Sequence, residues 1–135
     1  MLGEKFQEST GRITGQRVIN DGNGGVKVET SFAGNGKIYG IDAQEMGTYT
    51  AVMQPTGYLY GEGQGIAMTK DGDTISWKGH GIGKPTGKGL GVTYRASIAY
   101  QSHSPKYAKL NGVLGVIEWE VDENGTTKGQ AWEWR

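Results

Sequence analysis

Glycine alternates with other residues on both sides of a short turn in the middle of the chain. Residues 61–83 read GEGQGIAMTKDGDTISWKGHGIG. Glycine is disfavoured inside helices, and within a strand pattern it marks a bend or the close approach of another backbone. The 25 glycines among 135 residues lie in segments of period-two alternation and lack the Gly-X-Y period of collagen. The sequence therefore predicts a strongly curved β-sheet.

About eight strands are predicted, joined mostly by short turns. They cover roughly 4–19, 25–40, 45–54, the two segments that flank KDGD, 90–102, 113–122 and 126–135. The segment SPKYAKLNG (104–112) breaks the alternation and predicts a short helical connector with Pro105 at its first position. An open sheet of consecutive hairpins would leave two long edges, which closure removes. We therefore expect residues 1–135 to form one all-β domain, a closed antiparallel meander barrel.

The Asp71-Gly72 pair predicts a two-residue hairpin turn, which fixes the register of the strands on either side. Counting outward from this turn, Ile66 faces Trp77, and these apolar residues mark their face of the hairpin as the interior. Glu62 and Gln64 share that face by the period of two along a strand. Both are therefore predicted to point into the barrel.

The Asn124-Gly125 pair predicts a second two-residue turn near the end of the chain. Counting outward places Trp119 opposite Gln130 and puts Trp132 and Trp134 on the interior face. The opposite face holds Glu118, Glu120, Glu133 and Arg135, and is predicted to lie outside.

Glu62 is the candidate catalytic residue. Desolvation in an apolar lumen favours the protonated form of a carboxyl group, which suits a general acid or base. In the alternative, structural interpretation, Glu62 is hydrogen-bonded to Tyr94, Tyr100 or Thr50 and holds the core together. The candidate ligand-binding residues of the lumen are Tyr58, Tyr60, Gln64, Trp77, Tyr94 and Tyr100.

Composition restricts the class of function. Lys+Arg equals Asp+Glu at 14 each, which argues against a nucleic-acid partner. The absence of cysteine excludes a disulfide framework, a thiolate metal site and a cysteine nucleophile, and only two histidines argue against a histidine-rich metal site. The chain starts without an apolar run, so we expect no membrane partner and a cytoplasmic location. No cofactor is expected, because strands continue after GEGQG and GHGIG where a dinucleotide fingerprint needs a helix.

The glycine-rich central hairpin (GEGQG and GHGIG), the SPKYAKLNG connector and the closing GVIEWEVDENGTTKGQAWEW resemble the small single-domain barrels grouped with allene oxide cyclase. They also resemble uncharacterised prokaryotic relatives of that group. The resemblance spans most of the chain as a pattern, with motif-like similarity in the second half, and implies a β-barrel. The wider group includes cofactor-free cyclases and isomerases and many proteins with no known activity. No catalytic motif of the cyclases matches here residue by residue.

Three functions remain open at this point. The leading one is the binding of a small, largely apolar molecule in the lumen. The second is a cofactor-independent cyclase or isomerase, in which the lumen folds the substrate and Glu62 exchanges a proton. The third is a barrel that assembles as a homo-oligomer through its exterior while side chains fill the lumen. A cavity lined by Glu62 would favour the first two functions, and a solid lumen the third.

Overall fold

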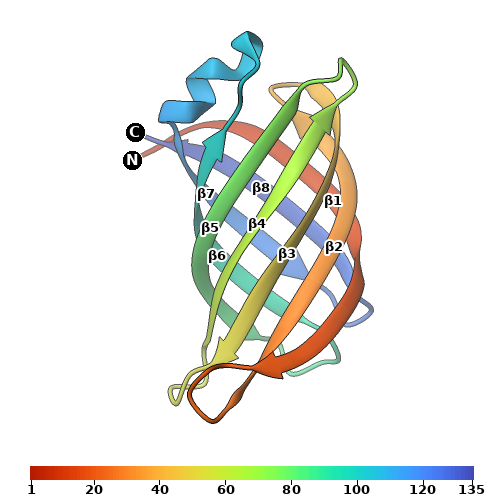
Figure 1. The fold of residues 1–135 in the computed structure, drawn as a ribbon, viewed down its shortest axis with the longest axis vertical. Helices are drawn as coiled ribbons and strands as arrows, with labels where there is room; N and C mark the ends of the chain where they lie inside the picture. Colours follow the sequence, from red (N-terminus) through yellow and green to blue (C-terminus); the bar gives the residue numbers. More distant parts are fainter.

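The computed structural model describes residues 1–135 as a closed barrel of antiparallel strands that follow one another in chain order (Figure 1). The eight strands are β1 (Leu2–Asn20), β2 (Val26–Ile38), β3 (Ile41–Met53), β4 (Leu59–Thr69), β5 (Thr74–Pro85), β6 (Val92–Gln101), β7 (Leu114–Val121) and β8 (Thr126–Trp134). A 3₁₀ helix, η1 (Pro105–Gly112), connects β6 to β7, and no helix here has the length and apolar character needed to cross a membrane. The predicted meander barrel and its connector are confirmed.

The turn between β4 and β5 is one residue longer than predicted. The amide of Gly72 donates to the carbonyl of Thr69 at 2.9 Å, and the amide of Thr69 donates to the carbonyl of Asp73 at 2.9 Å. Gly72 has a φ of +87°, as expected where a type I turn is followed by a glycine bulge. The loop therefore spans residues 70–72, and Ala67 pairs with Ile75.

This change of register moves every side chain of β4 to the other face of the sheet. Gly65 pairs with Trp77, and Glu62 pairs with His80. Glu62 and Gln64 are exposed on the outer wall. The prediction that these two side chains point into the barrel was wrong, because it assumed the shorter turn.

The turn between β7 and β8 has the same form. The amide of Asp122 donates to the carbonyl of Thr126 at 2.9 Å, and the amide of Gly125 donates to the carbonyl of Asp122 at 3.1 Å. Gly125 has a φ of +85°. Trp119 consequently pairs with Gly129 rather than with the predicted Gln130.

The longer turn also reverses the faces of β8. Trp132 and Trp134 project from the outer wall, and Trp134 is 52% exposed. Ala131 and Glu133 face the interior, where Glu133 is only 7% exposed. The predicted interior position of the two tryptophans and the predicted outer position of Glu133 were therefore wrong for the same reason.

The lumen holds two hydrophobic clusters, one toward each end of the barrel. The buried residues of the first are Phe6, Ile38, Ala43, Ala67, Ile75, Ile98, Tyr100, Tyr107, Leu110 and Ala131. Those of the second are Phe32, Val92, Tyr94, Trp119 and Val121. Tyr107 and Leu110 belong to η1, so the connector packs onto the end of the barrel near which the two termini lie (Figure 1).

Lumen-facing glycines make room for aromatic rings. A Cβ at Gly65 would lie 2.5 Å from Cζ2 of Trp77, and a Cβ at Gly83 would lie 2.5 Å from Cε1 of Tyr94. Both distances are far below the ordinary separation of about 3.5–4.0 Å between non-bonded carbon atoms. The glycines of the central hairpin thus allow large rings to fill a narrow barrel.

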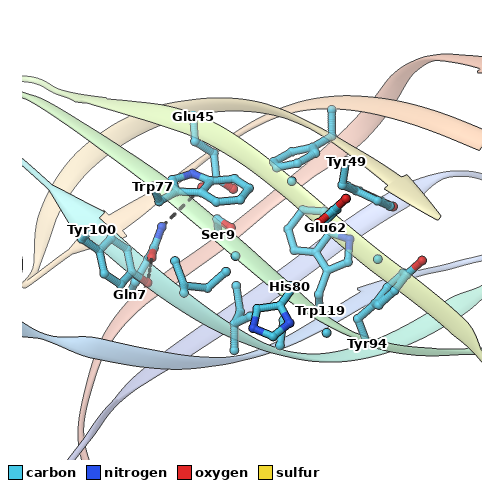
Figure 2. A pocket seen from close by; sticks show the side chains of 18 residues that line it. Gln7, Ser9, Glu45, Tyr49, Glu62, Trp77, His80, Tyr94, Tyr100 and Trp119 are labelled. Atoms are coloured by element: carbon cyan, nitrogen blue, oxygen red, sulfur yellow. Dashed lines mark hydrogen bonds between the residues drawn. The ribbon is translucent and has the colours of Figure 1, made fainter. Parts of the chain in front are cut away.

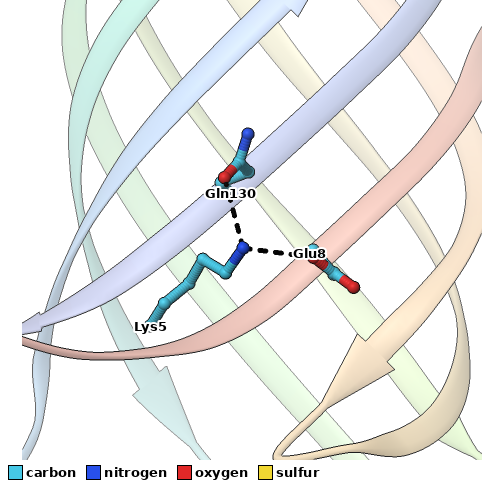
Figure 3. A network of polar contacts seen from close by, with 3 residues as sticks. All are labelled: Lys5, Glu8 and Gln130. Atoms are coloured by element: carbon cyan, nitrogen blue, oxygen red, sulfur yellow. Dashed lines mark hydrogen bonds and ion pairs between the residues drawn. The ribbon is translucent and has the colours of Figure 1, made fainter.

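The seam between β1 and β8 closes the barrel. The register shifts between Leu2 and Lys5 and again between Lys5 and Gln7. On the outer surface of this seam, Lys5 Nζ donates to Glu8 Oε2 at 3.3 Å and to Gln130 Oε1 at 3.5 Å (Figure 3). Exposed ion pairs of this kind contribute little to stability. Closure therefore depends mainly on the backbone hydrogen bonds and the buried side chains beneath them.

Candidate functional site

A cavity of about 80 Å³ lies where the two hydrophobic clusters meet (Figure 2). Six aromatic side chains line it: Phe32, Tyr49, Trp77, Tyr94, Tyr100 and Trp119. The polar side chains that join them from β1 and β3 are Gln7, Ser9 and Glu45. A cavity of this size exceeds the roughly 10–15 Å³ that one water molecule needs, but falls short of the roughly 300–1,000 Å³ of drug-sized ligand pockets. It suits a compact molecule or one group of a larger molecule.

The aromatic lining is continuous from strand to strand. The ring centroid of Phe32 lies 4.6 Å from that of Trp119 and 6.3 Å from that of Trp77. The Tyr49 and Tyr94 rings meet edge to face at 5.6 Å. Such contacts fix the rings in place, so one side of the cavity is a packed, preformed apolar wall.

Glu45 is held by neutral hydrogen-bond donors. Gln7 Nε2 donates to Glu45 Oε2 at 3.3 Å, and the hydroxyl of Tyr100 donates to Gln7 Oε1 at 3.4 Å (Figure 2). Burial raises the pKa of Glu45, and the hydroxyl of Ser9 opposes that rise. Because Glu45 forms no salt bridge, the lumen contains a carboxyl group without a cationic side chain to neutralise it.

Trp119 carries a buried donor. Its indole Nε1 makes no hydrogen bond with the protein. Burial also raises the pKa of Tyr49, while the nearby Trp119 and Thr30 side chains favour its ionised form. A buried donor without a partner costs about 1–3 kcal/mol of stability.

The structure brings together three of the seven predicted site residues. Trp77, Tyr94 and Tyr100 line the cavity. Tyr58, Tyr60, Glu62 and Gln64 are exposed, and the predicted lumenal position of these four was wrong.

Glu62 and His80 border the cavity only as part of its wall. They alternate with Gly61, Gly63, Gly79 and Gly81, which face inward and leave the wall thin here. The side chains of Glu62 and His80 are both exposed. No group of three or more His, Asp or Glu side chains could hold a metal ion.

Glu45, Gln7 and Ser9 were missed by the sequence interpretation. The sequence interpretation followed the face of the third strand that carries Met46, Thr48 and Val52, because these residues are largely apolar. It did not consider Glu45, which lies on the other face. One signal could have identified the inner face. Ala43, Glu45, Gly47 and Tyr49 follow the alternation of small and large residues that fits the inside of a narrow barrel.

Comparisons with known proteins define the fold. No family model and no curated protein matches this chain. Among solved structures, the chain is similar to a conserved protein of unknown function from Rhodopseudomonas palustris, with a TM-score of 0.81 and 18% identity over 98% of this chain and 97% of that one. It is also similar to a β-barrel-like protein from Acinetobacter baumannii AYE, with a TM-score of 0.82 and 14% identity over 100% and 96% of the two chains. A protein with unknown function from Clostridium acetobutylicum matches with a TM-score of 0.81 and 14% identity over 99% and 98%. The chain therefore shares its whole fold with uncharacterised prokaryotic β-barrel proteins.

Proposed function

We propose that this barrel binds a small, largely apolar molecule in its lumen. The observation that carries the proposal is the cavity inside the barrel, which six aromatic side chains line together with the polar side chains of Gln7, Ser9 and Glu45. Ligand sites combine a mainly apolar surface with a few polar groups that fix orientation. Here the aromatic rings would bury the body of the ligand, and Gln7, Ser9 and Glu45 would hold its polar end.

The alternative enzymatic function has lost its predicted acid or base, because Glu62 is exposed on the outer wall. The resemblance to the allene oxide cyclase group supports a site inside the barrel but assigns no reaction. The alternative of a solid lumen is weakened by the cavity, whereas assembly through the exterior stays a separate prediction. Binding without chemistry is therefore the function that the geometry supports best.

The first experiment looks for the ligand itself. Native mass spectrometry of the purified protein, followed by release of bound molecules in organic solvent, should detect a co-purified small molecule. A matched pair of variants then locates it. Ala96→Ile adds volume to the cavity lining, whereas Ala99→Ile adds the same atoms to the outer wall of the same strand.

We expect Ala96→Ile to lose the bound molecule and Ala99→Ile to retain it, with circular dichroism confirming that both are folded. When no molecule co-purifies, the same pair is tested with xenon, a compact apolar probe whose binding is followed by its NMR signal. Equal binding by both variants would place the ligand outside the lumen and contradict the proposal.

A further inference from the structure

The cavity combines an aromatic lining with an acidic group that no cationic side chain balances. Among its 18 lining residues are six aromatic side chains and Glu45, but no Lys or Arg. Gln7, which donates to Glu45, is neutral, and so is the nearby Ser9 hydroxyl. The negative faces of the surrounding rings add to the negative potential of a carboxylate. The lumen is thus electrostatically suited to positive charge.

We propose that the ligand of the lumen carries a small organic cation, an amine or quaternary ammonium group, which lies among the aromatic rings with Glu45 as its counter-ion. This inference rests on the proposed lumenal binding and specifies the class of ligand. Cation–π contacts with Trp and Tyr favour an ammonium group, and more strongly where the group is desolvated. A buried carboxylate gains stability when a cation approaches within a few ångströms.

The size of the cavity agrees with this class. Its 80 Å³ is about half of the roughly 150 Å³ of an apolar cavity that admits benzene. A compact alkylammonium head fits such a space better than a fused ring system does.

Other groups near the cavity do not offer an equivalent site. His80 borders the cavity, but its exposed side chain leaves it on the outer wall. Glu133, which is buried, already accepts from Tyr39 at 3.4 Å and pairs with Arg135 at 3.1 Å. Glu45, which is partly buried, therefore remains the lumenal carboxylate that lacks a cation.

The test compares two probes of the same shape. Choline and 3,3-dimethylbutan-1-ol differ in whether the central atom of the branched head is a charged nitrogen or a neutral carbon. Each is titrated into the whole protein at neutral pH and constant ionic strength. Binding is followed by tryptophan fluorescence and by the NMR signal of the Trp119 indole N–H.

We expect choline to bind at least tenfold more tightly than its neutral isostere. Glu45→Gln should weaken choline at least tenfold and change the affinity of the neutral isostere less than twofold. Glu45→Asp keeps the charge and should retain most of the choline affinity. Glu120→Gln is the matched control, because it removes an exposed carboxylate of β7 that does not line the cavity.

Equal binding of the two probes, or tighter binding of the neutral one, would overturn the cation inference and leave lumenal binding of apolar molecules in place. Binding of neither probe to the folded wild-type protein would also overturn the cation inference. The proposed function is then judged by the Ala96→Ile and Ala99→Ile pair alone, so the two failures are distinguishable.

Discussion

Gln7 and Glu45 lie on different strands and meet inside the barrel, where Gln7 Nε2 donates to Glu45 Oε2 at 3.3 Å. This neutral donor holds a carboxyl group that burial makes harder to ionise. Glu45 therefore links the stability of the fold, the pH dependence of that stability and the proposed ligand binding.

Glu45→Gln should make the protein more stable at neutral pH. Burial in the folded state raises the pKa of Glu45 above its ordinary value of 4.5. Stability from this group is therefore fully present below about pH 4.5 and is lost as the pH rises through the higher folded-state pKa. We expect a gain on the order of 1 kcal/mol at pH 7, the scale of a poorly satisfied buried polar group, and little gain at pH 4. Urea denaturation at both pH values measures it, with the exposed Glu62→Gln as control. A variant less stable than wild type at pH 7 would show that the carboxylate is structurally required.

Gly65→Ala should destabilise the barrel by about 1–3 kcal/mol, the usual cost of overpacking a filled core. The added Cβ would lie 2.5 Å from Cζ2 of Trp77 and 2.6 Å from the carbonyl oxygen of Met46. The control is Gly15→Ala, because a Cβ there meets nothing within 4 Å. That change should be neutral or stabilise by up to about 1 kcal/mol through the unfolded chain. Denaturant unfolding compares the stabilities of the two variants, because a shifted midpoint with an unchanged slope reports a change in stability. Equal effects of the two changes would show that the Trp77 ring moves freely.

Much of the fold could be predicted because two local signals agree. Period-two alternation identified the strands, and Gly- and Asn-rich segments identified the turns. The cavity residues Trp77, Tyr94 and Tyr100 were predicted correctly as lumenal, since the apolar residues of β5 and β6 mark one face of each strand without help from a turn.

The register could not be predicted from the Asp-Gly and Asn-Gly pairs alone. Asp122 stands three residues before Gly125, which is the residue pattern of a type I turn, and its side chain selects the longer loop. A two-residue turn with positive φ at both positions occurs instead at Tyr39-Gly40, where φ is 48° and 78°. Because one residue of register exchanges the two faces of a strand, this local error moved Glu62 and Gln64 to the wrong side.

Asp122→Ala should destabilise the β7–β8 hairpin by about 1–2 kcal/mol. Asp122 Oδ1 accepts hydrogen bonds from the amides of Asn124 and Thr126, both at 2.9 Å. Each bond to a charged acceptor contributes on the order of 1 kcal/mol, and exposure to solvent reduces the sum. The control is Glu123→Ala in the same loop, an exposed residue whose loss should change stability by less than about 0.5 kcal/mol. Thermal and urea unfolding measure the loss of stability in each of the two variants. A loss in Glu123→Ala as large as that in Asp122→Ala would show that the Asp122 side chain does not set the turn.

Tyr39 should ionise well above the usual pH for a phenol. Its ring packs on Phe6 at 5.3 Å, and its hydroxyl donates to Glu133 Oε1 at 3.4 Å. Burial and the negative charge of Glu133 raise the pKa of Tyr39 to about 12 from its ordinary value of 10.0. Its contribution to stability is therefore fully present below pH 10 and is lost as the pH rises through 12.

An absorbance titration at 295 nm tests this pKa. The folded wild-type protein should show a step near pH 12 that Tyr39→Phe lacks, whereas all tyrosines should ionise near pH 10 in concentrated denaturant. Tyr39→Phe also removes the donor to the buried Glu133, which keeps Arg135 as its partner at 3.1 Å. We therefore expect a loss of only about 0.5–1.5 kcal/mol at neutral pH. A Tyr39 step near pH 10 in the folded protein would mean that the hydroxyl reaches bulk water and that Glu133 does not hold this end of the barrel through Tyr39.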